Sequence, residues 1–281
     1  MTMIDKNVVV TGASSGVGLA VSILLAEQGA RVGMICRDPK RGWFMRNEVS
    51  KYAVNCPPIL FLADLSSQEQ IWRLAIELRR TFNHIDVLIN NAGAMFARRE
   101  LTEDGIERTL SVNHLARFLL TSLVIDLVTA APAGRIATVA SSCHSGSLDF
   151  ENLQSEGHYN FLAAYNRSKV CNILFTYELA RRLRGTRATA NCVSPGPTAT
   201  RLGDNMVGFP RLISRILKNI RLVYPEAGAE TLVYVASSPY LGSVSGRFFQ
   251  ECRERPSKPI TYDIDVARCL WYTSEALCGL L

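Results

Sequence analysis

The sequence lacks the cysteine and histidine spacings of a zinc site. None of its eight cysteines forms a Cys-x-x-Cys pair, and none of its four histidines stands at a ligand spacing from them. No metal site is therefore expected, and the thiols are expected to be free, mostly as small buried hydrophobic groups. Unpaired thiols, with a glycine-rich turn directly after the first apolar run, predict a reducing, cytoplasmic location without a signal peptide.

The sequence also lacks an uninterrupted hydrophobic run and a block of one charge. Its most apolar long stretch, 115–131, is broken by Arg117 and Asp126, so no integral membrane span is expected. The net charge of +6 comes from scattered lysines and arginines without interleaved aromatic residues. Such a charge mildly favours acidic or phosphorylated small ligands, and it does not indicate a nucleic-acid partner.

What the sequence does contain is a repeated alternation of β-branched and amphipathic segments, which is typical of successive βαβ units. Strands are expected at 7–11, 31–36, 59–63, 86–89, 135–140, 186–193 and 246–250. Helices are expected at 16–28, after Asp38-Pro39, and at 67–81, 103–128, 161–183, 225–236 and 265–277. No linker or repeat divides the chain. We therefore predict an α/β fold: a single domain, 1–281, with a doubly wound parallel sheet of the Rossmann type.

Residues 197–224 interrupt the alternation and are predicted to form a helical substrate lid. Apolar residues form one stripe of this insertion, and basic residues form another, which consists of Arg211, Arg215, Lys218 and Arg221. One interpretation is a solvated basic face over an apolar pocket. The alternative is a contact with an acidic carrier protein or with a membrane surface.

Three glycines, Gly12, Gly16 and Gly18, follow the first predicted strand. In a strand–turn–helix unit, the first permits a tight turn, the second lets backbone approach a pyrophosphate, and the third allows the helix to pack closely on the strand. The helix N-terminus then presents free N–H groups to the phosphates. A glycine-rich turn alone is common, but its place in the first βαβ unit predicts a dinucleotide site.

The end of the second predicted strand indicates which dinucleotide is bound. Arg37 stands there, and a basic residue accommodates the 2′-phosphate of NADP, whereas an acidic residue binds the 2′-hydroxyl of NAD. Asp38 is a competing acid, but it stands one position later and suits the cap of the next helix. The sequence therefore favours NADP(H) over NAD(H).

Tyr165 and Lys169 stand four residues apart, on one face of a predicted helix. A nearby ammonium group stabilises a phenolate and lowers the pKa of a tyrosine from its usual value of about 10. The spacing alone is also typical of an ordinary solvated helix. A catalytic interpretation of this spacing is supported by the residues around it, because open α/β sheets bind ligands at the carboxyl ends of their strands. Polar residues stand at such ends and in the helix between them: Asn90-Asn91-Ala92-Gly93, Asn113 and Ser141.

This ordered set resembles the short-chain dehydrogenase/reductase family over nearly the whole chain. The resemblance implies an oxidoreductase whose catalytic residues are Asn113, Ser141, Tyr165 and Lys169. It also implies a cofactor site made of Gly12, Ser14, Ser15, Gly16, Val17, Gly18, Arg37, Asp64, Leu65, Asn91, Ala92, Gly93, Tyr165, Lys169, Pro195, Gly196, Thr198 and Thr200.

By this resemblance, Tyr165 gives a proton to a carbonyl oxygen as hydride arrives, or removes one in the oxidation direction. Ser141 polarises the same oxygen, and Ser142 is the alternative to it. Lys169 holds the nicotinamide ribose and lowers the pKa of Tyr165. Asn113 anchors a water molecule that relays protons.

Several stretches resemble the retinol-dehydrogenase-like branch of the family, among them Ile35-Cys36-Arg37-Asp38 and Val112-Asn113-His114-Leu115. The branch implies NADP and lipophilic alcohols, aldehydes or ketones as substrates, and light-dependent protochlorophyllide reductases are its relatives. The chain departs from the branch at Ala116-Arg117, where such proteins usually have Gly-His. The membrane anchor of many animal members is not expected here. A ketone or aldehyde reductase of secondary biosynthesis is therefore kept beside a retinoid enzyme.

Two other functions stay open. One keeps the cofactor and Tyr165 but reduces a double bond, or cyclises or epimerises its substrate. The other is a non-catalytic NADP-binding protein that senses redox state, although such a protein has no need of the four catalytic residues. Family members also commonly form homodimers through the helices that correspond to 103–128 and 161–183, and an extra loop before Tyr165 would oppose this.

Overall fold

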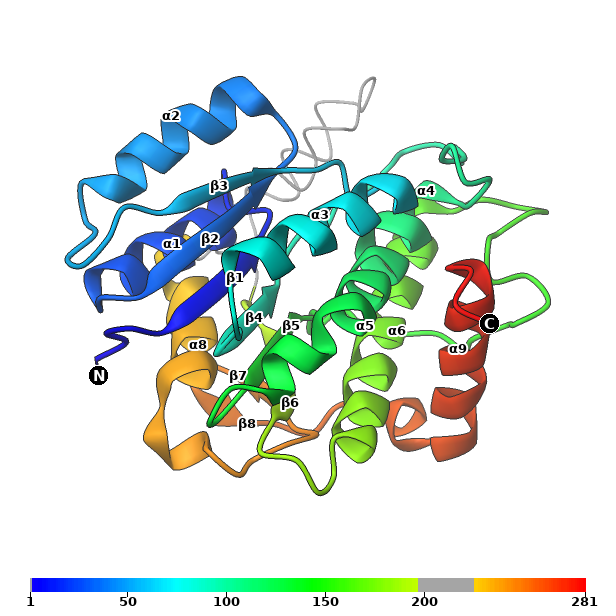
Figure 1. The fold of residues 1–281 in the computed structure, drawn as a ribbon. Coiled ribbons are helices and arrows are strands. Elements are labelled where there is room, and N and C mark those ends of the chain that lie inside the picture. The colour runs from blue at the N-terminus through cyan, green and yellow to red at the C-terminus, as the bar shows by residue number, and fades with distance from the viewer. Residues whose placement is uncertain (1, 197–224) are drawn as a thin grey trace.

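A computed structural model describes residues 2–196 and 225–281. In it, eight strands form one sheet in the order β3-β2-β1-β4-β5-β6-β7-β8 (Figure 1). Neighbouring strands are parallel, except for β7 and β8, which are antiparallel. The strands are β1 (Asn7–Thr11), β2 (Arg31–Cys36), β3 (Ile59–Leu62), β4 (Val87–Asn90), β5 (Arg135–Val139), β6 (Thr189–Ser194), β7 (Phe248–Gln250) and β8 (Arg253–Glu254). The predicted doubly wound α/β fold is confirmed.

Helices cover both faces of the sheet (Figure 1). On one face α1 packs beside α8 and α2, and on the other α3 packs beside α5, with α6 next to it. The helices are α1 (Gly16–Glu27), α2 (Pro39–Ser50), α3 (Gln68–Thr81), α4 (Arg108–Leu110), α5 (Ala116–Thr129), α6 (Phe161–Arg182), α8 (Pro225–Ser237) and α9 (Ile264–Leu277).

The residues of β1 divide between the two cores that these helices cover. Val8 and Val10 belong to the core under α1 and α8, whereas Val9 belongs to the core under α3, α5 and α6. All three side chains are fully buried. Successive side chains of a strand point to opposite faces, so a strand covered on both sides reads as a continuous apolar run.

The strand order opens a crevice at one edge of the sheet. From β1 the chain moves outward to β2 and β3, and then returns past β1 to β4 and onward to β5 and β6. The connections therefore leave β1 and β4 in opposite directions, and open α/β sheets bind ligands in the crevice at such a point. Thr11 and Asn90, the last residues of β1 and β4, lie at this crevice.

The helix predicted at 103–128 begins later and is not regular. Gly105 has a φ of 74° in a turn, and the Glu107 side chain accepts hydrogen bonds from the N–H groups of Thr109 and Leu110, so the helix starts at Arg108. A π-helical turn, η1 (Ser111–Leu115), separates α4 from α5. Such π-turns are frequent at functional sites.

Two predicted strands are shorter than expected at their first residues. The strand predicted from 186 begins at Thr189, because the Thr186 hydroxyl accepts a hydrogen bond from the N–H of Ala188 in a turn. The strand predicted from 246 begins at Phe248, since Gly246 has a φ of 72°, which ends the preceding turn. Neither difference moves a candidate site residue.

The C-terminal helix α9 packs along α6 on the outside of the molecule (Figure 1). The Trp271 ring lies 4.9 Å from Phe118 of α5 and 5.9 Å from Phe175 of α6, measured between ring centroids. These helices correspond to the homodimer surface that the family resemblance implies. Part of that surface is therefore covered by the same chain.

One helical stretch of the described residues, Arg108–Thr129, is long and apolar enough to cross a membrane by length and composition. Within it, 67% of the most apolar window is buried inside the protein. This burial is what packing of α5 against α3 and the sheet requires.

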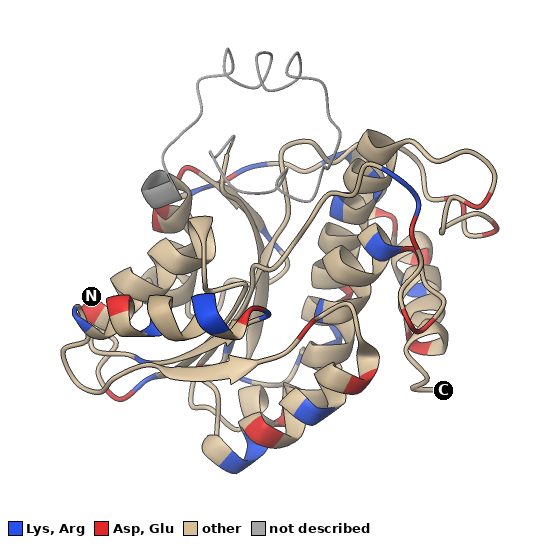
Figure 2. Cartoon of the chain, turned by 90° about the horizontal axis from the view of Figure 1, so that it is seen from above, with Lys and Arg blue, Asp and Glu red and all other residues tan. Residues whose placement is uncertain are grey.

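The predicted lid, 197–224, lies outside the described residues, and so does its basic stripe. Over the described part, lysines and arginines are interspersed with aspartates and glutamates (Figure 2). A partner for the lid therefore stays a prediction from the sequence.

Candidate active site

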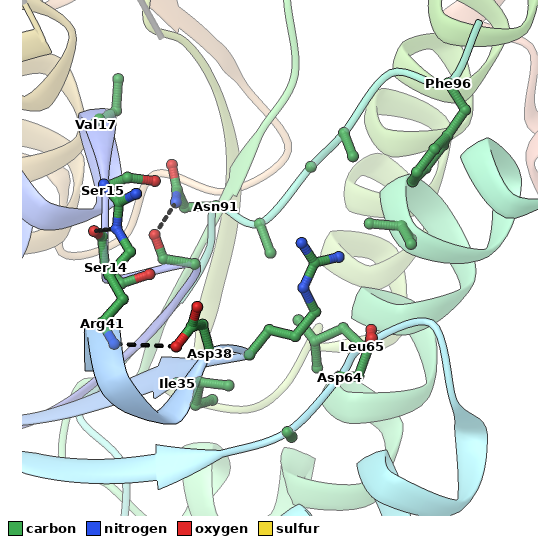
Figure 3. A pocket seen from close by; sticks show the side chains of 18 residues that line it. Ser14, Ser15, Val17, Ile35, Asp38, Arg41, Asp64, Leu65, Asn91 and Phe96 are labelled. Carbon is green, nitrogen blue, oxygen red and sulfur yellow. Dashed lines mark hydrogen bonds between the residues drawn. The ribbon is translucent and has the colours of Figure 1, made fainter. Parts of the chain in front are cut away.

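A cavity of about 330 Å³ opens at the carboxyl ends of the central strands. The glycine-rich turn after β1 forms one wall, and the Asn91-Ala92-Gly93 segment after β4 forms another (Figure 3). Of the predicted cofactor residues, Gly12, Ser14, Ser15, Gly16, Val17, Arg37, Asp64, Leu65, Asn91, Ala92 and Gly93 line it. Other lining residues are Ile35, Asp38, Arg41, Ala63, Ala94, Phe96 and Val112.

The glycine-rich turn needs its glycines for two physical reasons. Gly12 and Gly16 have φ values of 66° and 53°, which side chains disfavour. Gly18 does not line the cavity; a Cβ there would overlap the Gly12 carbonyl and the Asn91 amide. Gly18 therefore lets α1 start close to β1 and β4, as the packing role of the third glycine predicts.

Charged residues gather at the β2 end of the cavity. Arg37 is exposed and lines it, as predicted, and Arg41 lines it from the first turn of α2. The Arg41 Nε donates to the Ser14 carbonyl at 2.9 Å (Figure 3). The Asp38 carboxylate accepts from the Arg41 N–H at 3.0 Å, so it caps α2 as expected. Arg41 was not predicted as a site residue; it stands two positions after Pro39, in the first turn of α2.

Hydrogen bonds fix the segment after β4 to the end of β1. The Thr11 hydroxyl accepts from the N–H groups of Asn91 and Ala92, both at 2.9 Å, and the Asn91 side chain donates to the Thr11 carbonyl at 2.8 Å. On the far side of the cavity, Asp64 accepts from both the N–H and the hydroxyl of Ser66. These bonds hold the cavity walls in place.

Asn113 lies in the π-helical turn and is fully buried. Its side-chain oxygen accepts from the Ala94 N–H at 2.7 Å, and its amide nitrogen donates to the Ala94 carbonyl at 2.9 Å and to the Ser168 hydroxyl at 3.0 Å. The Asn113 side chain thus ties the cavity wall after β4 to α6. All of its described bonds are to protein groups, and the relay water stays a prediction.

Ser141 follows β5 and reaches the tyrosine of α6. The Ser141 side chain lowers the pKa of Tyr165, and its hydroxyl accepts from the Cys143 N–H at 3.0 Å. His144 braces the loop: Nδ1 donates to the Ser141 carbonyl at 2.6 Å, and Nε2 accepts from the Lys258 N–H at 2.9 Å. A second cavity of about 590 Å³ borders this loop and is lined by Ser142, His144, Phe248 and residues of the 250–258 segment.

Tyr165 and Lys169 lie next to each other, as their spacing predicts. The Lys169 Nζ is 5.2 Å from the centroid of the Tyr165 ring, and Lys169 is buried. A Cβ added to Gly93 would lie 3.7 Å from that Nζ and 3.3 Å from the Asn113 oxygen. The four catalytic candidates therefore meet where the dinucleotide cavity ends.

The expected direction of the Tyr165 pKa is wrong. Burial raises the pKa of Tyr165 to about 12 and outweighs the hydrogen bond from Ser141 and the charge of Arg117, both of which lower it. Burial also lowers the pKa of Lys169 well below its usual range, and Arg117 lowers it further. Lys169 is not a dominant cation for the tyrosine, because desolvation disfavours its own charged form.

Arg117 is the functional candidate that the sequence showed only as a departure from the family. It is 4% exposed, and its guanidinium donates to the carbonyls of Val139 and Ala92 at 2.8 and 2.7 Å. Burial lowers the pKa of Arg117 to about 10, which leaves the side chain charged at neutral pH. The burial and the hydrogen bonds of Arg117 could not be predicted from the sequence, which shows only a charged residue within an apolar stretch.

Some predicted site residues are not brought to the cavity by the described structure. Pro195 and Gly196 follow β6, and Gly196 has a φ of 76°, as its turn requires. Thr198 and Thr200 lie outside the described residues. Among the residues that are described, no group of three or more His, Cys, Asp or Glu side chains is placed to hold a metal ion.

Comparison with known proteins agrees with this geometry. A model of the short chain dehydrogenase family matches residues 6–208. Retinol dehydrogenase 14 of Homo sapiens is 40% identical over 297 positions, which cover 99% of this chain and 88% of that protein.

Two solved structures share the fold. An uncharacterized protein from Mycobacterium paratuberculosis is 29% identical with a TM-score of 0.77, covering 99% of this chain and 95% of that one. A short chain dehydrogenase from Burkholderia cenocepacia J2315, solved in complex with NADP, is 24% identical with a TM-score of 0.71, covering 89% of this chain and 97% of that one. With the family model, the full-length likeness and the site in agreement, the chain belongs to the short-chain dehydrogenase/reductase family and is similar to retinol dehydrogenases within it.

Proposed function

We propose that this chain is an NADP(H)-dependent oxidoreductase that reduces the carbonyl group of a lipophilic aldehyde or ketone, with Tyr165 as the general acid. The observation that carries the proposal is the meeting of Ser141, Tyr165 and Lys169 at the end of the dinucleotide cavity, where Lys169 Nζ lies 5.2 Å from the Tyr165 ring centroid and Ser141 lowers the tyrosine pKa. The likeness to retinol dehydrogenase 14 supports a lipophilic alcohol or aldehyde as the reaction partner.

The described residues fit a dinucleotide phosphate. Gly12 and Gly16 give the turn the shape that phosphates need, and the N-terminus of α1 follows directly. Arg37 and Arg41 supply two cations at the end of β2, where the adenosine ribose of such cofactors lies, and Asp38 is engaged in its cap. The cofactor, when bound, supplies the hydride.

The protein's own groups handle the proton. The pKa of Tyr165, raised to about 12 by burial, keeps the phenol protonated at neutral pH, so its O–H donates to the carbonyl oxygen of a substrate. The Ser141 hydroxyl lies beside the phenol and polarises the same oxygen. The second cavity, which borders Ser142, is the candidate space for the rest of the substrate. In the oxidation direction Tyr165 removes the proton instead.

The test is absorbance at 340 nm with NADPH and three probes: decanal, 2-decanone and retinal. We expect turnover of at least one probe by the unmodified protein and a loss of about 10² to 10⁴-fold in Tyr165→Phe. Binding of NADPH, followed by its fluorescence, should be nearly unchanged in that variant. Tyr240→Phe is the matched control, because Tyr240 is 83% exposed and lines neither cavity.

The alternatives give different results in the same assay. Tight NADPH binding without turnover of any probe would favour a non-catalytic redox-sensing protein. Turnover that survives Tyr165→Phe would contradict the proposed acid. Reduction of a carbon–carbon double bond in retinal, with the carbonyl intact, would favour another outcome on the same fold.

We also propose that the protein works in a reducing, cytoplasmic compartment. All eight cysteines lie within the described residues and are unpaired, which suits such a compartment. A role in biosynthesis is proposed on the same footing as one in retinoid metabolism, and the product of the probe assay decides between them.

A further inference from the structure

Arg117 is a buried cation without an acidic partner in the described structure. It is the second residue of α5 and is 4% exposed. No described carboxylate lies within ion-pair distance of its guanidinium, and its Nε has no hydrogen-bond partner. A buried charge is destabilising unless it is paired or hydrogen-bonded. Hydrogen bonds to two carbonyls satisfy part of this guanidinium, but without an ion pair its burial suggests a role other than stability.

Its two hydrogen bonds join the two halves of the site. The Ala92 carbonyl belongs to the segment that lines the dinucleotide cavity, and the Val139 carbonyl ends β5, two residues before Ser141. The planar guanidinium holds both carbonyls at once, which an ammonium group cannot do with the same geometry. The Asn172 amide adds a longer bond, 3.3 Å, to the Val139 carbonyl.

Its charge also faces the proton chemistry. Arg117 lowers the pKa of Tyr165 against the larger effect of burial, and it lowers the pKa of Lys169 in the same direction as burial. Other groups face this cluster from every side: Ser141 and Cys143 toward Tyr165, and Cys192 and His114 toward Arg117. Burial lowers the pKa of His114 to about 3 and raises that of Cys192 to about 12, so both are neutral near pH 7. Arg117 is thus the permanent charge of the cluster.

We propose that Arg117 is a positioning residue that, through its two hydrogen bonds to carbonyls and its fixed charge, ties the cofactor-lining segment to the strand end that carries the catalytic serine. The activity side of this proposal rests on the function proposed above. The stability side does not, because it concerns only the titration of the folded chain.

The first experiment compares Arg117→Met with Arg117→Lys in the probe assay. Loss of the cation should raise the pKa of Lys169, so the pH limb of kcat/KM that reports the Lys169 charge should move to higher pH in Arg117→Met. Arg117→Lys keeps the charge but not the double hydrogen bond. It should leave the limb in place and raise KM for NADPH severalfold.

Arg135→Met is the matched control. Arg135 is also partly buried, and its guanidinium donates to two backbone carbonyls, those of Val235 and Ser238, away from the site. Arg135→Met should lower the free energy of unfolding without moving the pH limb of kcat/KM. An unchanged limb in Arg117→Met, with a loss of stability like that of Arg135→Met, would show a merely structural residue and overturn the proposal.

The second experiment needs no substrate, so it separates this proposal from the proposed function. A base whose pKa is lowered by folding binds fewer protons in the native state, and stability therefore rises with pH. The pH slope of the unfolding free energy, measured by denaturant below the usual lysine pKa of about 10.4, should be smaller in Arg117→Met, because the pKa of Lys169 then rises toward its usual range. In the background of Lys169→Met, the same change should not alter the slope. An equal effect of Arg117→Met in both backgrounds would overturn the electrostatic link to Lys169.

Discussion

The two halves of the site are built in different ways. The cofactor half, between β1 and β3, is an open cavity shaped by backbone and glycine, with exposed charges such as Arg37 at its rim. The catalytic half, between β4 and α6, consists of buried polar side chains: Asn113 and Arg117 form hydrogen bonds with backbone and side chains, and Lys169 lies beside the Tyr165 ring.

This difference predicts which substitutions each half of the site tolerates. A backbone cavity depends on close approach and local conformation, so it is sensitive to added atoms and tolerant of changes in exposed side chains. A buried polar cluster depends on every member finding its partners, so the loss of one group changes the pKa values of its neighbours.

The largest effect is expected in the catalytic half, at Ser141. Ser141→Ala removes the hydroxyl that bonds to Tyr165 and polarises the carbonyl, so kcat should fall by about 10² to 10³-fold. Ser142→Ala is the neighbouring control and should lower kcat by less than about tenfold, because Ser142 is exposed and only borders the second cavity. Equal losses in the two variants would reassign the catalytic serine.

The next effect is expected in the cofactor half, at Gly18. Gly18→Ala places a methyl group against the Gly12 carbonyl and the Asn91 amide, which should destabilise the fold by about 1–3 kcal/mol. The Kd for NADPH should also rise about tenfold or more, since the turn must shift. In Gly157→Ala the methyl group meets open space, and both the denaturation midpoint and the Kd should stay near those of the parent protein.

A smaller effect is expected from the charges at the rim. Arg41→Met removes one cation near the β2 end of the cavity, so the ratio of NADPH to NADH affinity should fall about three- to tenfold. Lys40→Met removes an exposed charge that does not line the cavity and is the control. A fall of the same size in both variants would mean that general charge, rather than a placed guanidinium, selects the cofactor.

The smallest effect is expected from the brace of the catalytic loop. Burial lowers the pKa of His144, so the unfolded chain binds more protons than the native protein as the pH falls below 6.5. Stability should therefore fall on acidification from pH 7 to 5, and His144→Gln should flatten this dependence while costing about 1 kcal/mol at pH 7. His158→Gln, at an exposed histidine, should leave the pH dependence of Tm as it is. The same pH dependence of Tm in His144→Gln and His158→Gln would contradict the role of His144 in holding the catalytic loop.

Much of the cofactor half could be predicted from the sequence. Gly12, Gly16 and Gly18 have roles that depend on neighbours a few residues away, and the alternation of strands and helices fixed where their turn would lie. Asp38 was recognised as a cap because its partner, the Arg41 N–H, is three residues on. Features that depend on residues only a few positions apart, such as this turn and this cap, can be predicted from the sequence.

The catalytic half was predictable in its residues but not in its electrostatics. Tyr165 and Lys169 were placed by their spacing, yet the direction of the tyrosine pKa was wrong because burial depends on elements distant in the chain. Arg117 shows the same limit: its partners, Ala92 and Val139, are 25 and 22 residues away. The docking of Trp271 of α9 on α5 and α6 likewise depends on packing that no short spacing encodes.

The central claim is that hydride passes to a carbonyl carbon while Tyr165 supplies the proton. The most direct measurement is the product formed from decanal with NADPH that carries deuterium at the transferred position. We predict one deuterium on the carbinol carbon of the decanol formed, and no product with Tyr165→Phe beyond about 1% of the parent rate. Decanol without deuterium at that carbon, or labelled decanol formed equally fast by Tyr165→Phe, would contradict the account.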